Sequence, residues 1–204
     1  LEIANHRDID RACDQAGVRL TPRDIFQHQT VAELAEAAGA APAVEAEQGL
    51  VTGPVFLTPI QKWFFELDLI DPHYFNQAVL LEVKQKLDAD LFREAVEHLI
   101  SHHDALRLRF IESNSKWEQM GTGPDAVVPF SAVDLSGVDG MEQRSALERA
   151  SAGLQGSLHL SDGPLLRVTL FDLGPNQRQR LFLVIHHLAV DGVSWRILLE
   201  DLQT

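Results

Sequence analysis

The sequence predicts an α/β (α+β) sandwich, in which a mixed sheet is flanked by helices. Beyond residue 54, segments with helical periodicity alternate with short runs of strand-forming residues, which is typical of chains that cover a sheet with helices. One of these runs, residues 105–112, alternates apolar and polar side chains with the period of a half-buried strand. Before residue 40 only short helices are indicated.

The N-terminal part predicts a small all-helical piece over residues 1–39. Residues 9–17 place apolar side chains on one helical face and end at a glycine. Thr30 and Glu33 have the spacing of a capping box at the start of a second helix. Residues 40–54 are rich in Ala, Glu, Gly and Pro and offer little to bury, so we expect a linker there.

The clearest helix start beyond the linker is at residues 57–67, LTPIQKWFFEL. Thr58 is placed to be the N-cap, a proline follows at the first helical position, and Gln61 occupies the third. Helical spacing favours core packing for Trp63 and Phe64. Phe65 is left open between the core and a ligand channel.

Three further helices and six strands complete the prediction. The helices are expected at residues 88–103, 140–156 and 193–203, and the strands at residues 75–83, 105–112, 116–120, 127–135, 164–173 and 180–187. In the second of these strands Arg107 and Arg109 share the face opposite the apolar residues. They either pair with an acidic residue such as Asp191 or cover a solvated strand face, and the alternation of the strand is compatible with both arrangements.

Composition excludes several classes of protein. The chain has 204 residues and a formal net charge of −13, which disfavours binding to nucleic acid. No apolar run reaches the roughly 18–20 residues that span a bilayer, and no basic cluster suggests a membrane surface. The single cysteine, Cys13, fits a cytoplasmic setting. The chain lacks both a signal peptide and an initiator Met, so we expect a fragment of a longer polypeptide.

Two adjacent histidines, His186 and His187, end the last predicted strand and precede Asp191 and Gly192. Successive strand residues point to opposite faces, so only one histidine can project into a given channel and the other must serve the scaffold. Gly192 permits a positive φ at the turn into the final helix, and Asp191 can cap that helix or pair with an arginine. The alternative is that both histidines are hydrogen-bonded core residues and Asp191 is only an N-cap.

These residues carry a resemblance to a known family. HHLAVDG, residues 186–192, matches HHxxxDG, the active-site motif of the condensation-domain superfamily of nonribosomal peptide synthetases, which shares its fold with chloramphenicol acetyltransferase. The continuation VSWRILLEDL (193–202) and the stretch TPIQKWFFE (58–66) resemble the versions found in epimerization domains, and HHDALRLRF (102–110) resembles a further motif of the superfamily. Residues 55–204 are therefore identified as similar to the N-terminal lobe of an epimerization domain.

The resemblance implies an epimerase that converts an L-aminoacyl or peptidyl thioester to the D-form by removing and returning the Cα proton. His187 would face the substrate tunnel and act as acid or base at Cα, or stabilise the enolate. Asp191 would hold the motif loop through an arginine, with Arg107 and Arg109 as possible supports. The motif residues expected to support the site are His186, Asp191, Gly192, Ser194 and Trp195.

The resemblance also implies partners. Residues 16–38 are similar to the last helices of a peptidyl carrier domain, but residues 1–50 contain no serine that could accept phosphopantetheine. The substrate would thus arrive on the phosphopantetheine arm of a carrier domain, and no cofactor would bind this chain directly. A C-terminal lobe supplying a glutamate on the opposite face of Cα, and neighbouring synthetase modules, are the other expected partners.

Two other functions and one metal site are alternatives. A condensation domain would use His187 to activate or position an acceptor amine, although Trp195 and the 58–66 stretch argue against it. A non-catalytic docking module for carriers is the alternative from another class. His98 and His102, four residues apart with His103 and Asp104 beside them, could ligate a metal, but a solvated helix end is favoured and no metal site is expected.

Overall fold

The computed structural model describes residues 20, 24, 27, 28, 30–38, 49–114 and 116–203, and the chain divides into two units, residues 1–48 and 49–204. In the first unit, helix α3 (Val31–Ala38) begins with the capping box that the sequence predicts. The Thr30 amide donates to Glu33 Oε2 over 3.1 Å, and the Glu33 amide donates to Thr30 Oγ1 over 3.3 Å. The helix expected at residues 9–17 lies outside the described residues.

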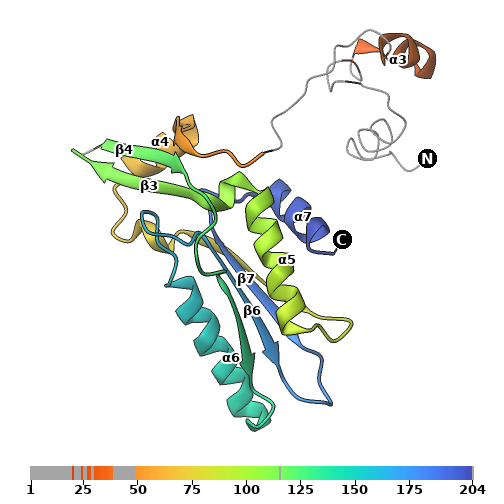
Figure 1. The fold of residues 1–204 in the computed structure, drawn as a ribbon, viewed down its shortest axis with the longest axis vertical. Helices are drawn as coiled ribbons and strands as arrows, with labels where there is room; N and C mark the ends of the chain where they lie inside the picture. Colours follow the sequence, from red (N-terminus) through yellow and green to blue (C-terminus); the bar gives the residue numbers. More distant parts are fainter. Residues whose placement is uncertain are drawn as a thin grey trace. The chain divides into compact units, whose positions relative to one another are not determined.

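The second unit contains two sheets (Figure 1). The smaller sheet has the order β1-β4-β3, with antiparallel pairing between β1 (Gly53–Val55), β4 (Lys116–Gly121) and β3 (Leu108–Ser113). The larger sheet has the order β2-β7-β6-β5 and comprises β2 (Asn76–Glu82), β7 (Arg180–His186), β6 (Leu166–Asp172) and β5 (Phe130–Asp134). Only the β5–β6 pair of this sheet is parallel, so the sheet is mixed, as predicted.

Helices cover both faces of the larger sheet (Figure 1). Helices α5 (Ala89–His102) and α7 (Gly192–Asp201) pack on one face, and α6 (Gly140–Gln155) packs on the other. Helix α4 (Pro59–Glu66) precedes β2, and two short 3₁₀ helices, η1 (Pro72–Tyr74) and η2 (Asp104–Arg107), connect the elements. None of the helices described here is long and apolar enough to cross a bilayer.

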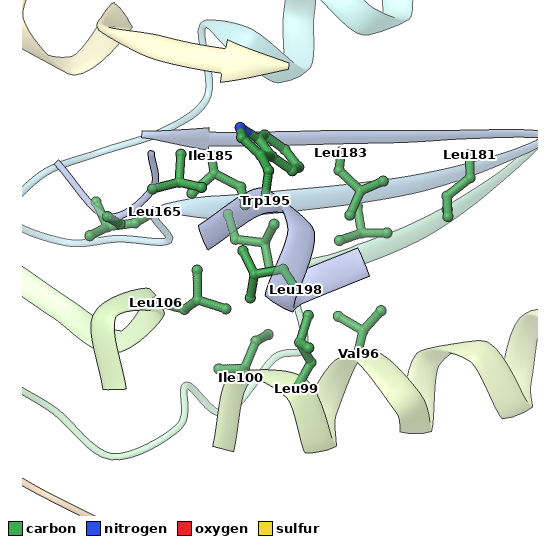
Figure 2. Close-up of a cluster of buried hydrophobic side chains, with 14 of the residues drawn as sticks. Val96, Leu99, Ile100, Leu106, Leu165, Leu181, Leu183, Ile185, Trp195 and Leu198 are labelled. Carbon is green, nitrogen blue, oxygen red and sulfur yellow. The ribbon is translucent and has the colours of Figure 1, made fainter. Parts of the chain in front are cut away.

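Strand β7 is the centre of the core. It lies between β2 and β6, and its six residues from Leu181 to His186 are buried, because helices cover both of its faces. Leu181, Leu183 and Ile185 face α5 and α7, and Figure 2 shows them gathered with Trp195 and Leu198 of α7. The residues between them, such as Phe182 and Val184, join the cluster under α6. This alternation confirms the period predicted for the strand.

Two features differ from the sequence prediction. Residues 104–107 form η2 rather than the beginning of a strand, so β3 starts only at Leu108. Gly53 and Pro54, which the sequence places in the linker, belong to the short strand β1. β1 pairs with β4, which lies more than 60 residues further along the chain, and a pairing of that range leaves no local signal.

We expect Leu183→Ala to lower the free energy of unfolding by about 2–5 kcal/mol, because Leu183 is fully buried in the centre of β7 and its loss leaves a cavity. The measurement is urea denaturation of the two proteins. Leu80→Ala on the neighbouring strand is the matched control, since Leu80 is 48 % exposed and its truncation should change stability by about 0.5 kcal/mol or less. Equal losses in the two variants would contradict the assigned core.

Candidate active site

His186 is bound into the scaffold by both ring nitrogens. It is the last residue of β7, opposite Asn76 of β2, and it is fully buried. Its Nε2 lies 2.8 Å from the carbonyl oxygen of Pro72, and its Nδ1 accepts from the amide of Leu188 over 3.2 Å. Since a carbonyl can only accept, the proton resides on Nε2. His186 therefore ties η1 to the turn that follows β7.

Burial sets the charge state of His186. Loss of hydration lowers the pKa of His186 to about 4, and the nearby rings of His73 and His187 add to this effect. The aromatic rings of Phe64 and Phe75 lie edge-on to the imidazole, at centroid distances of 6.0 and 6.4 Å. His186 is thus a neutral, packed residue near neutral pH.

His187 has different surroundings. It follows the end of β7 and is half-buried, and its amide donates to the carbonyl oxygen of Phe75 over 2.8 Å. The Phe75 ring stacks on the imidazole at a centroid distance of 5.1 Å and an interplanar angle of 21°. The ring nitrogens lie 2.8 Å from the Val190 carbonyl oxygen (Nδ1) and 3.2 Å from Gln77 Nε2 (Nε2). Gln77 Oε1 in turn accepts from Trp195 Nε1 over 2.8 Å.

His187 borders an open cavity of about 420 Å³ beside helix α4. The cavity is predominantly apolar, and its lining comprises Thr58, Ile60, Gln61, Trp63, Phe64, Phe75, His187 and Leu188. Thr58 and Gln61 form the predicted capping box, which fixes the start of α4 next to this space. The arrangement offers one titratable imidazole at the edge of an apolar chamber, which suits proton transfer to a bound organic group.

The aromatic residues of α4 divide among three environments. Phe64 is buried as predicted, and Phe65 stacks on Trp117 with centroids 4.2 Å apart. The core prediction for Trp63 is wrong, because Trp63 is 52 % exposed and lines the cavity. Helical spacing identifies residues that share a face, but it does not reveal whether another element covers that face.

Asp191 caps helix α7. Its Oδ1 accepts from the amides of Val193 and Ser194 over 3.0 and 2.7 Å and from the Ser194 hydroxyl over 2.7 Å. These hydrogen bonds, led by the one from the Ser194 side chain, lower the pKa of Asp191. Gly192 does not adopt the positive φ that glycine permits: it is the first residue of α7, and an added Cβ would meet no atom within 4 Å.

Among the residues that the structure describes, no arginine pairs with Asp191, contrary to expectation. Arg107 is buried, donates to the carbonyl oxygens of Ile100, Ser101 and Thr122, and pairs with Asp104. Arg109 is buried too, and its Nη2 lies 2.6 and 2.7 Å from the carboxylate oxygens of Asp125. Both arginines therefore support the chain around β3 and β4, and the solvated alternative is wrong for them as well.

One group of side chains in the described part of the chain could hold a metal ion. His102, His103 and Asp201 bring their ligand atoms within 4.8 Å of one another, at the end of α5 and the end of α7. His103 Nε2 lies 2.7 Å from Asp201 Oδ2, so this pair already connects the two helices. His98, which the sequence places with His102, is not part of the group.

Three contacts of His187 were not predicted from the sequence: Gln77, Phe75 and the Val190 carbonyl. A signal for Gln77 existed, because Gln77, Val79 and Leu81 alternate along β2 and the two apolar residues pack on the core. A glutamine on a core face requires a polar partner. The identity of that partner, 110 residues away, has no local signature.

Acid should destabilise the fold through His186. The unfolded chain protonates this histidine near its ordinary value of 6.5, whereas the folded chain does so only at about 4, so stability falls as the pH drops through this window. Between pH 7 and pH 4 we expect His186 to contribute a loss on the order of 3 kcal/mol. Urea denaturation of wild type and His186→Gln at both pH values measures it. Identical pH dependence in the two proteins would contradict the assignment.

Asp191→Ala should lower the free energy of unfolding by about 0.5–2 kcal/mol, because the first turn of α7 loses its cap. Asp191→Asn should remain close to wild type, since asparagine caps equally well without charge. Thermal unfolding followed by circular dichroism distinguishes the variants. If Asn proved as damaging as Ala, the carboxylate charge rather than the cap would be what matters.

Comparison with known proteins gives the family. Residues 51–204 match the family described as Condensation domain. The chain is 52 % identical over 188 residues to one polypeptide of the linear gramicidin synthase of Brevibacillus parabrevis, covering 92 % of this chain and 2 % of that protein. It is 49 % identical over 190 residues to chondramide synthase of Chondromyces crocatus, covering 93 % of this chain and 5 % of that protein. The chain thus spans only a few per cent of these relatives.

Solved structures agree on the fold. The epimerization domain from the third module of tyrocidine synthetase B superposes with a TM-score of 0.73 at 39 % identity, covering 79 % of this chain and 35 % of that one. The starter condensation domain of rhizomide synthetase superposes with a TM-score of 0.62 at 22 % identity, covering 74 % and 36 %, and bears on the fold alone. The predicted sandwich of the chloramphenicol acetyltransferase type is confirmed. The chain therefore belongs to the Condensation domain family of the nonribosomal peptide synthetases.

Proposed function

We propose that this chain is part of an epimerization domain, which converts an L-aminoacyl or peptidyl residue to its D-form while the residue is held as a phosphopantetheine thioester. The observation that carries the proposal is the position of His187, whose imidazole borders an apolar cavity while its neighbour His186 is locked in the scaffold. The epimerization domain of tyrocidine synthetase B, at 39 % identity, supports this choice over condensation.

The chemistry requires a base and a later acid at Cα. His187 takes the Cα proton, and the electron pair of the broken C–H bond is delocalised into the thioester carbonyl as an enolate. A proton delivered to the opposite face then gives the other configuration, so no electrons are gained or lost and no redox cofactor is needed. We propose that the group on that opposite face belongs to the rest of the domain. The superposition with the tyrocidine synthetase B epimerization domain covers only 35 % of that chain.

The surface around the cavity is consistent with further chain or substrate covering it. Large apolar side chains around α4 and η1 are exposed, among them Phe56, Ile60, Trp63, Ile70 and Tyr74. Exposed apolar side chains gathered on neighbouring elements favour association with another surface. We propose that the remaining lobe of the domain and the carrier-bound substrate approach here, in the cytoplasm, and that neighbouring synthetase modules supply the carrier.

Condensation is the second candidate, because the matched family takes its description from that reaction. In that case His187 would position or deprotonate the acceptor amine rather than act at Cα. The two functions differ in a single observable, since only epimerization exchanges the Cα hydrogen with solvent.

His187→Ala should reduce exchange at Cα by about 10²- to 10⁴-fold, the usual contribution of a positioned acid or base. The synthetase polypeptide that includes this chain, its carrier and the complete domain is loaded with an L-aminoacyl group in D₂O, and deuterium at Cα and the D/L ratio are measured by mass spectrometry and chiral chromatography. His102→Ala is the matched control, because His102 is exposed and lies at the end of α5.

Other outcomes separate the alternatives. A correctly loaded wild-type protein that shows no exchange would contradict epimerization. Peptide-bond formation with an offered acceptor, lost in His187→Ala, would then assign condensation. If neither reaction occurred, non-catalytic docking of a carrier domain would be the remaining candidate function.

A further inference from the structure

A chain of three hydrogen bonds runs from Trp195 to the backbone through Gln77 and His187. Trp195 Nε1 lies 2.8 Å from Gln77 Oε1, Gln77 Nε2 lies 3.2 Å from His187 Nε2, and His187 Nδ1 lies 2.8 Å from the Val190 carbonyl oxygen. Its members come from β2, from the end of β7 and from α7, so the tertiary fold assembles it.

The two ends of this chain determine every proton within it. The indole nitrogen of Trp195 can only donate, so the Gln77 atom facing it must be the carbonyl oxygen. The amide NH₂ of Gln77 therefore faces His187, and because it too can only donate, His187 Nε2 must accept. At the other end the Val190 carbonyl can only accept, so Nδ1 of His187 carries the proton. Both ends require the same tautomer.

This arrangement leaves a lone pair on Nε2, the only ring nitrogen of His187 that is not bound to the backbone. The Gln77 contact, at 3.2 Å, is at the long end of hydrogen-bond distances, so the amide orients the ring without holding it tightly. Gln77 is itself half-buried and cannot turn its amide over without setting two donors against each other at Trp195.

We propose that Gln77 is a positioning residue of the site, which, held by Trp195, keeps His187 in the tautomer whose Nε2 is unprotonated, and that Nε2 takes a proton when substrate replaces the 3.2 Å contact with Gln77. This role rests on the proposed epimerization, since it is useful to a reaction that begins with removal of a proton. Phe75 completes the arrangement by fixing the plane of the imidazole through stacking.

Gln77→Glu replaces the hydrogen-bond donor that faces His187 Nε2 with an acceptor and leaves the size of the side chain almost unchanged. One carboxylate oxygen still accepts a hydrogen bond from Trp195, and the other now accepts a hydrogen bond from His187 Nε2, which keeps a proton on that nitrogen. Gln77→Met removes donor and acceptor while keeping the length of the side chain. Gln85→Glu is the matched control, because it adds the same charge at an exposed position after β2.

In the complete synthetase polypeptide, the acidic limb of the pH–rate profile for Cα deuterium exchange should move upward by about 1–3 pH units in Gln77→Glu, as expected for a carboxylate beside an imidazole. Gln77→Met should lower the rate and move the limb far less than Gln77→Glu does, because it removes the hydrogen bond to unprotonated Nε2 but adds no charge, and Gln85→Glu should match wild type. A Gln77→Glu profile that coincides with wild type would overturn the proposal, provided that circular dichroism shows an unchanged melting curve.

A second readout needs no substrate. Diethylpyrocarbonate modifies unprotonated imidazole nitrogens, and mass spectrometry resolves the rate at His187, with the exposed His102 as an internal reference. Relative modification at His187 should slow at least tenfold at neutral pH in Gln77→Glu but not in Gln85→Glu. If modification of His187 slowed in Gln77→Glu while the wild-type protein showed no Cα exchange, the positioning role of Gln77 would be supported and the epimerase function would be contradicted. Unchanged modification in a folded Gln77→Glu protein would overturn the role itself.

Discussion

The antiparallel pairing of β2 with β7 is the interaction on which the site depends. Its register places Asn76 opposite His186 and Gln77 opposite Ile185, which brings Gln77 beside the histidine that follows the strand. A slip of one residue would move Gln77 to the other face of the sheet and remove its contacts with both His187 and Trp195. The register is held by burial, because β7 is covered on both faces and its apolar side chains, from Leu181 to Ile185, each have a defined place in one of two clusters. The geometry of the site is therefore stabilised by the core of the larger sheet.

Adjacent histidines perform different tasks because the strand ends between them. His186 belongs to β7, is fully buried, and uses both ring nitrogens to connect η1 with the turn after the strand. His187 lies one residue beyond the strand and borders the cavity, with its ring held by Phe75, Val190 and Gln77. The same local fold gives the two imidazoles opposite proton positions, on Nε2 in His186 and on Nδ1 in His187. Asp191 stabilises this arrangement by capping α7, which carries Trp195.

The sequence predicted what is decided locally. The capping boxes at Thr30 and Thr58, the helices of residues 49–204 and the alternation of β7 follow from patterns within a few residues, and they are confirmed. The side-chain partners could not be predicted, because they depend on contacts between distant elements. Arg109 pairs with Asp125 rather than with Asp191, and Gln77 meets Trp195 across 118 residues of sequence. Trp63 was assigned to the core from its spacing, yet it is exposed, because periodicity says nothing about which faces are covered.

The opposite proton positions of the two neighbouring histidines can be measured by ¹⁵N nuclear magnetic resonance of the histidine-labelled chain at neutral pH. Two-bond couplings from the ring carbon protons distinguish a protonated from an unprotonated nitrogen, and the single variants assign each signal. We expect a proton on Nε2 of His186, hydrogen-bonded to the Pro72 carbonyl, and a proton on Nδ1 of His187, hydrogen-bonded to the Val190 carbonyl. A proton on Nε2 of His187 would contradict this expectation, because Gln77 could not then donate to that nitrogen while accepting from Trp195.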